Sequence, residues 1–354
     1  MFAAAVLYAQ QPAAPAAVSQ ASQPAPAQAA TQPPAQQPAA QTTPQSPAKV
    51  SPQPSSQTAQ QPAAQPSGQA EQAAEPTIRL NVNEVSLIFT VTDAHGKYIS
   101  DLQQSDFALL DDRKAPTHVK SFHQQINLPL RVGIVIDSST SIRSRFKFEQ
   151  QSAIEFLLEI LKARSDRAFV MDFAETTRVD QDWTNNIDAL ESGVNRIFPA
   201  GSTAMYDAVY TACRDKMLSE RGQEPVRKAM VLISDGNDNQ SRVYLEEAIK
   251  ECQRAETIIY TVSTNWSPSR DKGDDALIQM AAETGGQAFF PPSVEEMSTS
   301  FSSIEEELRS QYALTYTPAD FKEDGAFRPI YLFCYDRRYQ VRTRKGYFAP
   351  LPQR

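Results

Sequence analysis

Apolar residues are spread unevenly along this chain, and the spacing between them changes at a few positions. Residues 10–76 are built almost entirely from Gln, Ala, Pro, Ser and Thr and contain most of the prolines of the chain. This segment has few large apolar side chains to bury and many positions without a backbone donor, so it predicts a disordered, partly extended spacer. Residues 77–354 carry nearly every Ile, Leu and aromatic residue and are long enough for a substantial hydrophobic core.

Two segments show the pattern of short strands, one on each side of the middle of the chain. Residues 77–128 are rich in β-branched and aromatic residues, with Val85, Leu87, Phe89 and Val91 at close spacing before a polar turn. This pattern predicts a small β-unit. Residues 311–354 have a similar pattern and predict a C-terminal β-tail. The expected strands are 82–91, 98–102, 107–110 and 118–122 in the first segment, and 312–316, 330–335 and 339–344 in the second.

Residues 129–310 alternate between apolar runs and segments with helical periodicity. The run at 132–136 is continuously apolar, as expected of a strand that is buried on both faces. The alternation predicts the α/β class, with a doubly wound, mostly parallel, Rossmann-like sheet flanked by helices and small β additions before and after it. The expected strands are 130–136, 168–173, 177–183, 229–233, 257–262 and 287–290, and the expected helices are 146–161, 187–197, 205–218, 244–254, 274–283 and 294–310.

Charge and cysteine content narrow the class of protein. The formal net charge is −8 and no basic patch is dense, which argues against nucleic acid as a partner. No stretch reaches the roughly 18 apolar residues that a membrane-spanning helix needs. Cys213, Cys252 and Cys334 cannot form a disulfide framework, and none has a C-x-x-C partner. We interpret them as small buried apolar residues, with one disulfide and one free thiol as the alternative.

The first residues indicate export. The apolar, Ala-rich run that ends at Ala9 resembles the end of a signal peptide, with a small residue before the expected cleavage point. We interpret residues 1–9 as the remnant of a signal peptide, although the run is short and lacks a positively charged start; an Ala-rich tail is the alternative. This interpretation predicts an exported protein that is periplasmic, exposed at the cell surface or secreted.

Three polar loops follow expected strands or open an expected helix. Asp137, Ser139 and Ser141 follow the first strand of the sheet, Asp235 follows the strand at 229–233, and Thr203 precedes the helix at 205–218. Ligands of such sheets bind beyond the carboxyl ends of the strands. The loops contain hydroxyls and carboxylates but no thiol or imidazole, and these oxygen ligands suit Mg²⁺, Mn²⁺ or Ca²⁺ better than zinc or copper. The sequence therefore predicts a divalent-cation site.

With these three loops in this order, the chain resembles the von Willebrand factor type A domain with its metal-ion-dependent adhesion site. The family's D-x-S-x-S motif is present as Asp137, Ser139 and Ser141, its loop threonine matches Thr203, and its second aspartate matches Asp235. The resemblance covers about residues 130–310. It implies that these five residues hold the ion, directly or through water, and that a carboxylate of a protein partner completes its coordination.

The flanking segments resemble one bacterial group of these proteins, the acidobacterial type. The similarity lies in the Val-Thr-Asp-x-x-Gly and Asp-Phe-x-x-x-Asp-Asp elements within residues 91–112, and in the Asp-Gly-x-Phe-Arg and Gly-Tyr elements within residues 324–347. One departure is visible in the metal-site loop, because Ser202 stands where the family often has glycine. The neighbouring Thr203 is unaffected.

Two further aspartates lie close to the predicted ligands in the sequence. Asp207 falls in the first turn of a helix, where a carboxylate is favourable on electrostatic grounds alone. Asp238 follows the strand loop that contains Asp235. Both are candidates for residues that support the ligands, and both are also explained as ordinary helix-start or loop residues.

The sequence provides no catalytic set. The three histidines, His95, His118 and His123, lie in the N-terminal β-unit, away from the loop serines in the sequence, and there is no G-x-S-x-G motif. Walker and Gly-x-Gly phosphate motifs are also absent. The charged run at 271–275 lacks the alternating ligands of an EF-hand, and we interpret it as a solvated segment before a helix. We therefore expect a protein that is not an enzyme.

The predicted function is divalent-cation-dependent binding of another protein that presents an Asp or Glu. The alternative is an assembly or scaffold protein in which the ion is structural and the β-units bind the partner. Several aromatic residues of the tail lie at strand spacing, and such residues are more typical of a core than of an exposed edge. They are Tyr331, Phe333, Tyr335, Tyr339, Tyr347 and Phe348.

Overall fold

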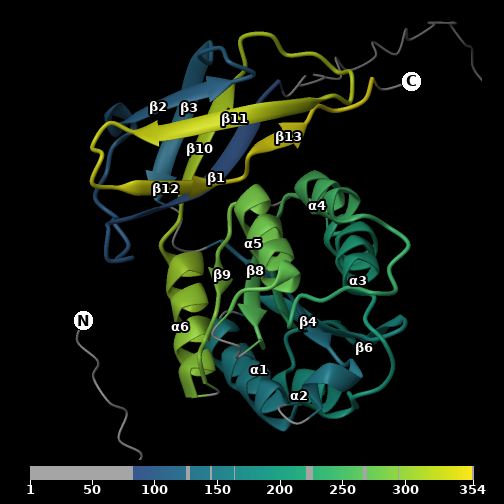
Figure 1. Ribbon diagram of the computed structural model, residues 1–354. Coiled ribbons are helices and arrows are strands. Elements are labelled where there is room, and N and C mark those ends of the chain that lie inside the picture. Colours follow the sequence, from purple (N-terminus) through teal and green to yellow (C-terminus); the bar gives the residue numbers. More distant parts are fainter. Residues whose placement is uncertain are drawn as a thin grey trace, which may run out of the picture. The chain divides into compact units, whose positions relative to one another are not determined.

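The structure is a computed structural model that describes residues 83–124, 128–143, 146–162, 164–220, 226–265, 269–293 and 295–352. The predicted signal-peptide remnant at 1–9 and the predicted spacer at 10–76 lie outside these ranges. Residues Pro76–Arg354 form one compact unit. Within it, the described residues build a helix-flanked sheet and a set of antiparallel β-sheets (Figure 1).

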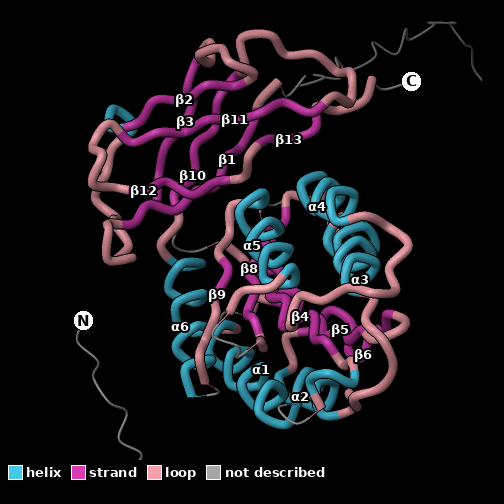
Figure 2. The backbone as a smooth tube through the Cα atoms, viewed as in Figure 1, coloured by secondary structure: helices cyan, strands magenta, loops and turns pink. Residues whose placement is uncertain are grey.

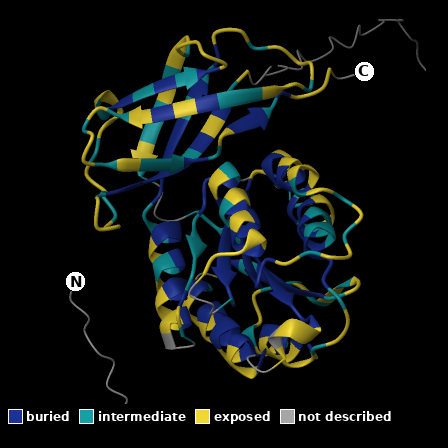
Figure 3. Ribbon diagram, in the orientation of Figure 1, coloured by how far each residue is buried: buried dark blue, intermediate teal, exposed yellow. Residues whose placement is uncertain are grey.

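The central sheet has six strands in the order β6-β5-β4-β7-β8-β9. All neighbouring pairs are parallel except β5 and β6, so the antiparallel strand lies at one edge. The central strands are buried on both faces (Figure 3), because their residues are almost all apolar. The predicted α/β fold class is confirmed. The strands are β4 (Leu130–Asp137), β5 (Arg167–Phe173), β6 (Thr177–Thr184), β7 (Arg227–Ser234), β8 (Thr257–Ser263) and β9 (Ala288–Phe289).

Helices cover both faces of this sheet (Figure 2). One hydrophobic core joins the sheet to α1, α2 and α6, and the other joins it to α3, α4 and α5. The sheet is buried on both faces because each helix has an apolar side that packs on the apolar strands. The helices are α1 (Phe146–Ile160), α2 (Ile187–Asn195), α3 (Met205–Thr211), α4 (Leu245–Arg254), α5 (Lys272–Thr284) and α6 (Glu295–Arg309).

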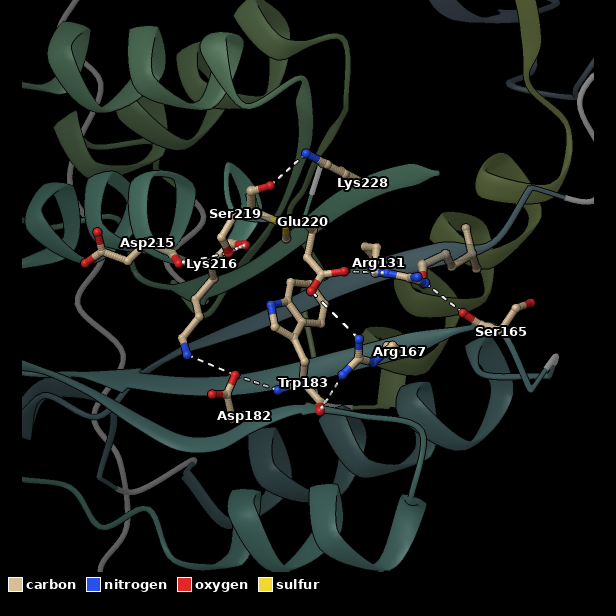
Figure 4. Close-up of polar contacts among 12 residues, drawn as sticks. Arg131, Ser165, Arg167, Asp182, Trp183, Asp215, Lys216, Ser219, Glu220 and Lys228 are labelled. Atoms are coloured by element: carbon tan, nitrogen blue, oxygen red, sulfur yellow. Dashed lines mark hydrogen bonds and ion pairs between the residues drawn. The ribbon is translucent and has the colours of Figure 1, made fainter. Parts of the chain in front are cut away.

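The single helix predicted at 205–218 has a different form in the structure. After α3 it continues as a wider π-helical segment, Ala212–Met217. Contacts with the sheet hold the end of this segment: Glu220 is paired with Arg131, with Nε and Oε2 2.8 Å apart, and Lys228 Nζ donates to the Met217 carbonyl at 2.7 Å (Figure 4). Tertiary contacts of this kind override the local preference for a regular α-helix.

The two predicted β-units combine in space. A four-stranded sheet has the order β12-β1-β10-β3 and a three-stranded sheet the order β13-β11-β2, so each contains strands from before and after the helix-flanked domain. Both sheets contribute to one hydrophobic core, which makes them a β-sandwich. The strands are β1 (Val85–Thr92), β2 (Phe107–Asp111), β3 (His118–Gln124), β10 (Tyr312–Thr317), β11 (Phe327–Cys334), β12 (Gln340–Thr343) and β13 (Gly346–Phe348).

The strand predicted at 98–102 was wrong. In this segment only Tyr98 forms a bridge, with Thr92. The following donors are satisfied elsewhere: Ile99 N donates to the Val91 carbonyl at 2.9 Å, and Leu102 N donates to the Tyr312 hydroxyl at 3.1 Å. Because a side chain replaces a strand partner, no ladder forms.

The first interpretation of the cysteines, as three small buried apolar residues, was wrong, and the alternative of one disulfide and one free thiol is correct. Cys213 and Cys252 form a disulfide, and the half-buried Cys334 is free. The two bonded residues lie 39 positions apart, one in the π-helical segment and one on α4. Packing of these two helical segments on the same face of the sheet brings the cysteines together, and sequence spacing does not show this.

The aromatic residues of the tail divide between core and surface. Tyr347 is buried as predicted, but Tyr331, Phe333 and Tyr335 are 46%, 52% and 69% exposed. The prediction was wrong for these three because side chains alternate along β11. Ile330 and Leu332 point into the sandwich core, so the residues between and after them point outward.

A buried polar cluster joins α6 to the sandwich. The Glu307 side chain is fully buried and pairs with Arg342 Nη2 at 2.6 Å. Thr90 Oγ1 donates to Glu307 Oε1 at 3.0 Å, and the Tyr98 hydroxyl donates to Oε2 at 3.4 Å. Burial raises the pKa of Glu307 more than Arg342 and the hydrogen bonds lower it. The cluster therefore fixes the last helix of the α/β domain to two strands of the sandwich.

Candidate metal centre

The first candidate ligand, Asp137, ends β4 and is fully buried. Its Oδ1 accepts the Ser139 backbone N–H at 2.8 Å, and its Oδ2 accepts the Ser234 hydroxyl at 2.7 Å. Burial is the main cause that raises the pKa of Asp137 to about 6, and the charge of Asp235 raises it further, while these hydrogen bonds lower it. The carboxylate is thus held between β4 and β7 and interacts electrostatically with the second predicted carboxylate.

The two predicted serine ligands lie side by side in the loop after β4. Ser139 Oγ and Ser141 Oγ are 2.9 Å apart. Ser139 is buried, whereas Ser141 is exposed, so the pair reaches from the interior to the surface. Adjacent ligands of an octahedral Mg²⁺ with bonds of about 2.1 Å lie about 3 Å apart. The spacing of the two hydroxyls therefore fits two neighbouring coordination positions.

Hydrogen bonds fasten the Thr203 loop to the serine loop. Ala200 N donates to the Ser138 carbonyl at 2.7 Å, and Thr140 Oγ1 donates to the Gly201 carbonyl at 3.0 Å. Gly201 has a φ of +77°, a conformation that suits glycine. Thr203 itself is buried, and its backbone N–H donates to Asn239 Oδ1 at 3.0 Å. The threonine is held between the serine loop and the loop after β7.

The second carboxylate, Asp235, directly follows β7 and is buried. Its Oδ1 accepts the Asn237 backbone N–H at 3.0 Å. Gly236 adopts a φ of +81°, and a Cβ there would lie 2.2 Å from the Gly273 carbonyl oxygen at the start of α5. Glycine at 236 therefore allows this loop to pack directly against α5 and keeps Asp235 near the end of the sheet.

Asp207 and Asp238 bind backbone groups of neighbouring loops. Asp207 Oδ1 accepts the N–H groups of Arg242 and Val243, both at 3.0 Å. Asp238 Oδ2 accepts the Tyr206 N–H at 3.0 Å and the Ser241 hydroxyl at 2.6 Å. These bonds tie the start of α3 to the loop after β7, and so position the two loops that carry Thr203 and Asp235.

Two supporting residues were missed in the sequence. Ser234 donates to Asp137, and its position immediately before Asp235 was the available signal. Asp172 on β5 accepts the Ser138 hydroxyl at 2.7 Å, and no local pattern indicates this because the two residues meet only in the folded sheet.

The five predicted ligands form an oxygen set of two carboxylates and three hydroxyls. In the part of the chain that the structure describes, no three His, Cys, Asp or Glu side chains are grouped as a metal site. The candidate centre differs from such a group, because three of its five candidate ligands are hydroxyls. Two mutually repelling buried carboxylates beside paired hydroxyls fit a hard divalent cation, whose charge would offset the repulsion. The three histidines lie in other segments, outside these loops.

Comparisons with solved structures return chains of low sequence identity. A von Willebrand factor type A protein from Catenulispora acidiphila is 14% identical, with 71% of this chain and 76% of that chain covered and a TM-score of 0.44. Proximal thread matrix protein 1 from the mussel byssus, with a zinc-occupied MIDAS motif, is 14% identical over 52% of this chain and 49% of that chain, with a TM-score of 0.44.

Sequence comparisons give a local match. Human von Willebrand factor A domain-containing protein 3B is 28% identical over 164 residues, which are 44% of this chain. The chain spans only 11% of the length of that relative. The family model described as von Willebrand factor type A domain matches residues 132–303. The matched segment contains all five predicted ligands.

Proposed function

Because residues 132–303 belong to the von Willebrand factor type A domain family, we propose that this chain is a divalent-cation-dependent protein-binding module of the adhesion type. The observation that carries the proposal is the pair of hydroxyls, Ser139 Oγ and Ser141 Oγ, 2.9 Å apart beside the buried Asp137. Neutral hydroxyls supply much of this site, so an ion bound there keeps a strong attraction for a further anionic ligand. This donor set supports a binding role.

In the proposed mechanism, the five predicted residues hold Mg²⁺, with Mn²⁺ or Ca²⁺ as alternatives. Asp137 and Asp235 supply negative charge from the buried side, while Ser139, Ser141 and Thr203 supply hydroxyl oxygens. The ion itself supplies Lewis acidity toward an oxygen anion. An Asp or Glu of a protein partner would approach the ion from the exposed side, where Ser141 lies. The hydrogen bonds of Ser234, Asn239 and Asp238 keep the loops in place for this step.

We further propose that the protein is exported. The Cys213–Cys252 disulfide supports this, because disulfides persist mainly in oxidising compartments. No helix among the described residues is long and apolar enough to cross a membrane. The apolar run at the start of the sequence is the second support.

A matched pair of neighbouring hydroxyls tests the metal site. We expect Thr203→Ala to weaken Mg²⁺ binding by more than about tenfold, because it removes a ligand oxygen. Ser202→Ala removes a hydroxyl one residue away that is not a predicted ligand, and we expect its affinity to stay within about twofold of the wild-type value. Calorimetric titration of Mg²⁺ into both full-length variants measures the difference. Equal affinities in the two variants would remove Thr203 from the site.

A second candidate function is that of a scaffold, in which the ion is structural and the β-sandwich binds the partner. The outward aromatic residues on β11 and directly after it favour it: Tyr331, Phe333 and Tyr335 are about half exposed or more. The rings of Tyr331 and Phe333 are parallel, with centroids 6.4 Å apart. Partner binding that survives EDTA and is lost on Phe333→Ala would support this candidate over the first.

A further inference from the structure

Two large apolar side chains near the candidate metal centre are unusually exposed. Phe198 and Tyr244 are each 73% exposed, the largest fraction for any large apolar side chain in the described part of the chain. Phe198 lies in the loop that leads to Thr203, and Tyr244 lies at the end of the loop that begins with Asp235. Isolated exposed aromatics are common on protein surfaces. Here, however, the two most exposed ones belong to loops that carry candidate ligands.

Hydrogen bonds place Phe198 beside the serine loop. The residues that follow it are held there, because Ala200 N donates to the Ser138 carbonyl at 2.7 Å and Arg143 Nη2 donates to the Pro199 carbonyl at 3.4 Å. Arg143 comes two residues after Ser141. The exposed Phe198 and Arg143 therefore lie on two adjoining loops, one of which also carries the two serine hydroxyls.

The exposed charges of these loops are of one sign. Among residues 138–143, 197–204 and 235–244, the exposed charged side chains are Arg143 and Arg242. Asp235 is buried, and Asp238 is half-buried and occupied by hydrogen bonds. One exposed carboxylate, Glu175, lies on a neighbouring loop close to Gly201. The exposed charge nearest the serine hydroxyls in the sequence is thus that of Arg143, whereas the exposed Glu246 and Glu247 follow Tyr244 at the start of α4.

We infer that the surface formed by Phe198 and Arg143 selects an acidic partner segment in which an apolar side chain lies next to the coordinating carboxylate. This inference rests on the proposed function and adds the composition of the partner to it. The partner's carboxylate would face the ion held by the five predicted residues, its neighbouring apolar side chain packs on Phe198, and a second acidic residue pairs with Arg143. Aromatic and Arg side chains contribute most of the binding energy in many protein interfaces, and complementary charge favours the correct partner.

A library of short random peptides displayed on phage tests this inference with the full-length chain. Peptides bound in Mn²⁺ are recovered by adding EDTA and are sequenced. We expect the recovered peptides to share an Asp or Glu with an apolar neighbour and a second acidic residue. Phe198→Ala and Arg143→Gln should each weaken the binding of a recovered peptide by more than about tenfold. Neither residue is a candidate ligand, so both variants should bind Mn²⁺ alone with wild-type affinity.

The matched controls lie outside the loops of the candidate centre. Leu158, near the end of α1, is 54% exposed and the Arg338 side chain is 80% exposed, so Leu158→Ala and Arg338→Gln remove an exposed apolar and an exposed cationic group and should leave peptide binding unchanged. Recovered peptides without an apolar or second acidic residue overturn this inference and leave the proposed function intact. If Phe198→Ala and Arg143→Gln bind a recovered peptide with wild-type affinity, the inference is likewise overturned and the proposed function stands. If the chain binds Mn²⁺ but EDTA releases no peptide from the library, both the inference and the proposed function are overturned.

Discussion

We expect Glu307→Ala to lower the free energy of unfolding by about 3 kcal/mol. The substitution removes a fully buried carboxylate and leaves Arg342, whose side chain is 24% exposed, without its ion-pair partner. It also removes the acceptor for the Thr90 hydroxyl. Because Glu307 lies on α6, and Thr90 and Arg342 lie on β1 and β12, the loss falls on the junction between the α/β domain and the sandwich. Urea denaturation followed by circular dichroism measures the change.

Glu305→Ala provides a control on the same helix. Glu305 pairs with Lys162, and the two side chains are 18% and 59% exposed; an ion pair that remains open to solvent on one side contributes about 1 kcal/mol or less. A second control replaces both members of the buried pair by apolar residues, as in Glu307→Leu with Arg342→Met. Such replacements often restore stability, because no charge remains buried without a partner. Equal losses for Glu305→Ala and Glu307→Ala would show that the buried cluster does not stabilise the junction.

We expect loss of the Cys213–Cys252 disulfide to cost about 4 kcal/mol, the value that chain entropy predicts for the loop that it closes. The two residues are 39 positions apart in the sequence and both are fully buried. Replacing both by Ala avoids new buried polar groups. The free energy of unfolding of the double variant, compared with that of the wild-type chain under non-reducing conditions, gives the contribution.

Cys334→Ala is the matched control, because Cys334 is free and only half-buried. We expect it to change stability far less than the double variant does. A wild-type chain whose unfolding is unaffected by a reducing agent would contradict the assigned disulfide.

Much of the α/β fold is predictable because each element obeys its own local rule. The apolar run at 132–136 predicts a central strand, and β4 has this run buried on both faces. The interpretation of the charged run at 271–275 as a solvated segment before a helix was wrong, because the Asp271 carboxylate accepts the N–H groups of Gly273 and Asp274 as the N-cap of α5, and Asp274 is buried. Local periodicity therefore identifies most helices and strands but not where each one begins.

Features that depend on distant parts of the chain are not predictable in this way. The sandwich pairs Phe89 with Tyr312, two residues from opposite ends of the described chain. The disulfide and the Glu307–Arg342 pair likewise join segments that no local pattern relates. The outward ring of Phe333 was also not predictable. The alternation of side chains along a strand defines two faces, but it does not tell which face is covered by a second layer.

The candidate site lies between these cases. The order of the loops identifies Asp137, Ser139, Ser141 and Asp235, because each follows the carboxyl end of a strand and those ends meet at one edge of a parallel sheet. The supporting contact of Asp172 with Ser138 depends on strand pairing and was missed. Whether the five residues bind an ion stays a prediction.

Calorimetric titration of Mg²⁺ and Mn²⁺ into the full-length wild-type chain and the Asp137→Asn variant tests the central claim most directly. Asparagine keeps a carbonyl oxygen for the Ser139 N–H but lacks the charge of the carboxylate, and circular dichroism reports whether the variant is folded. The account predicts saturable binding of one ion per wild-type chain, weakened by more than about a hundredfold in the folded variant. No saturable binding to the wild-type chain, or the same affinity in both chains, would contradict it.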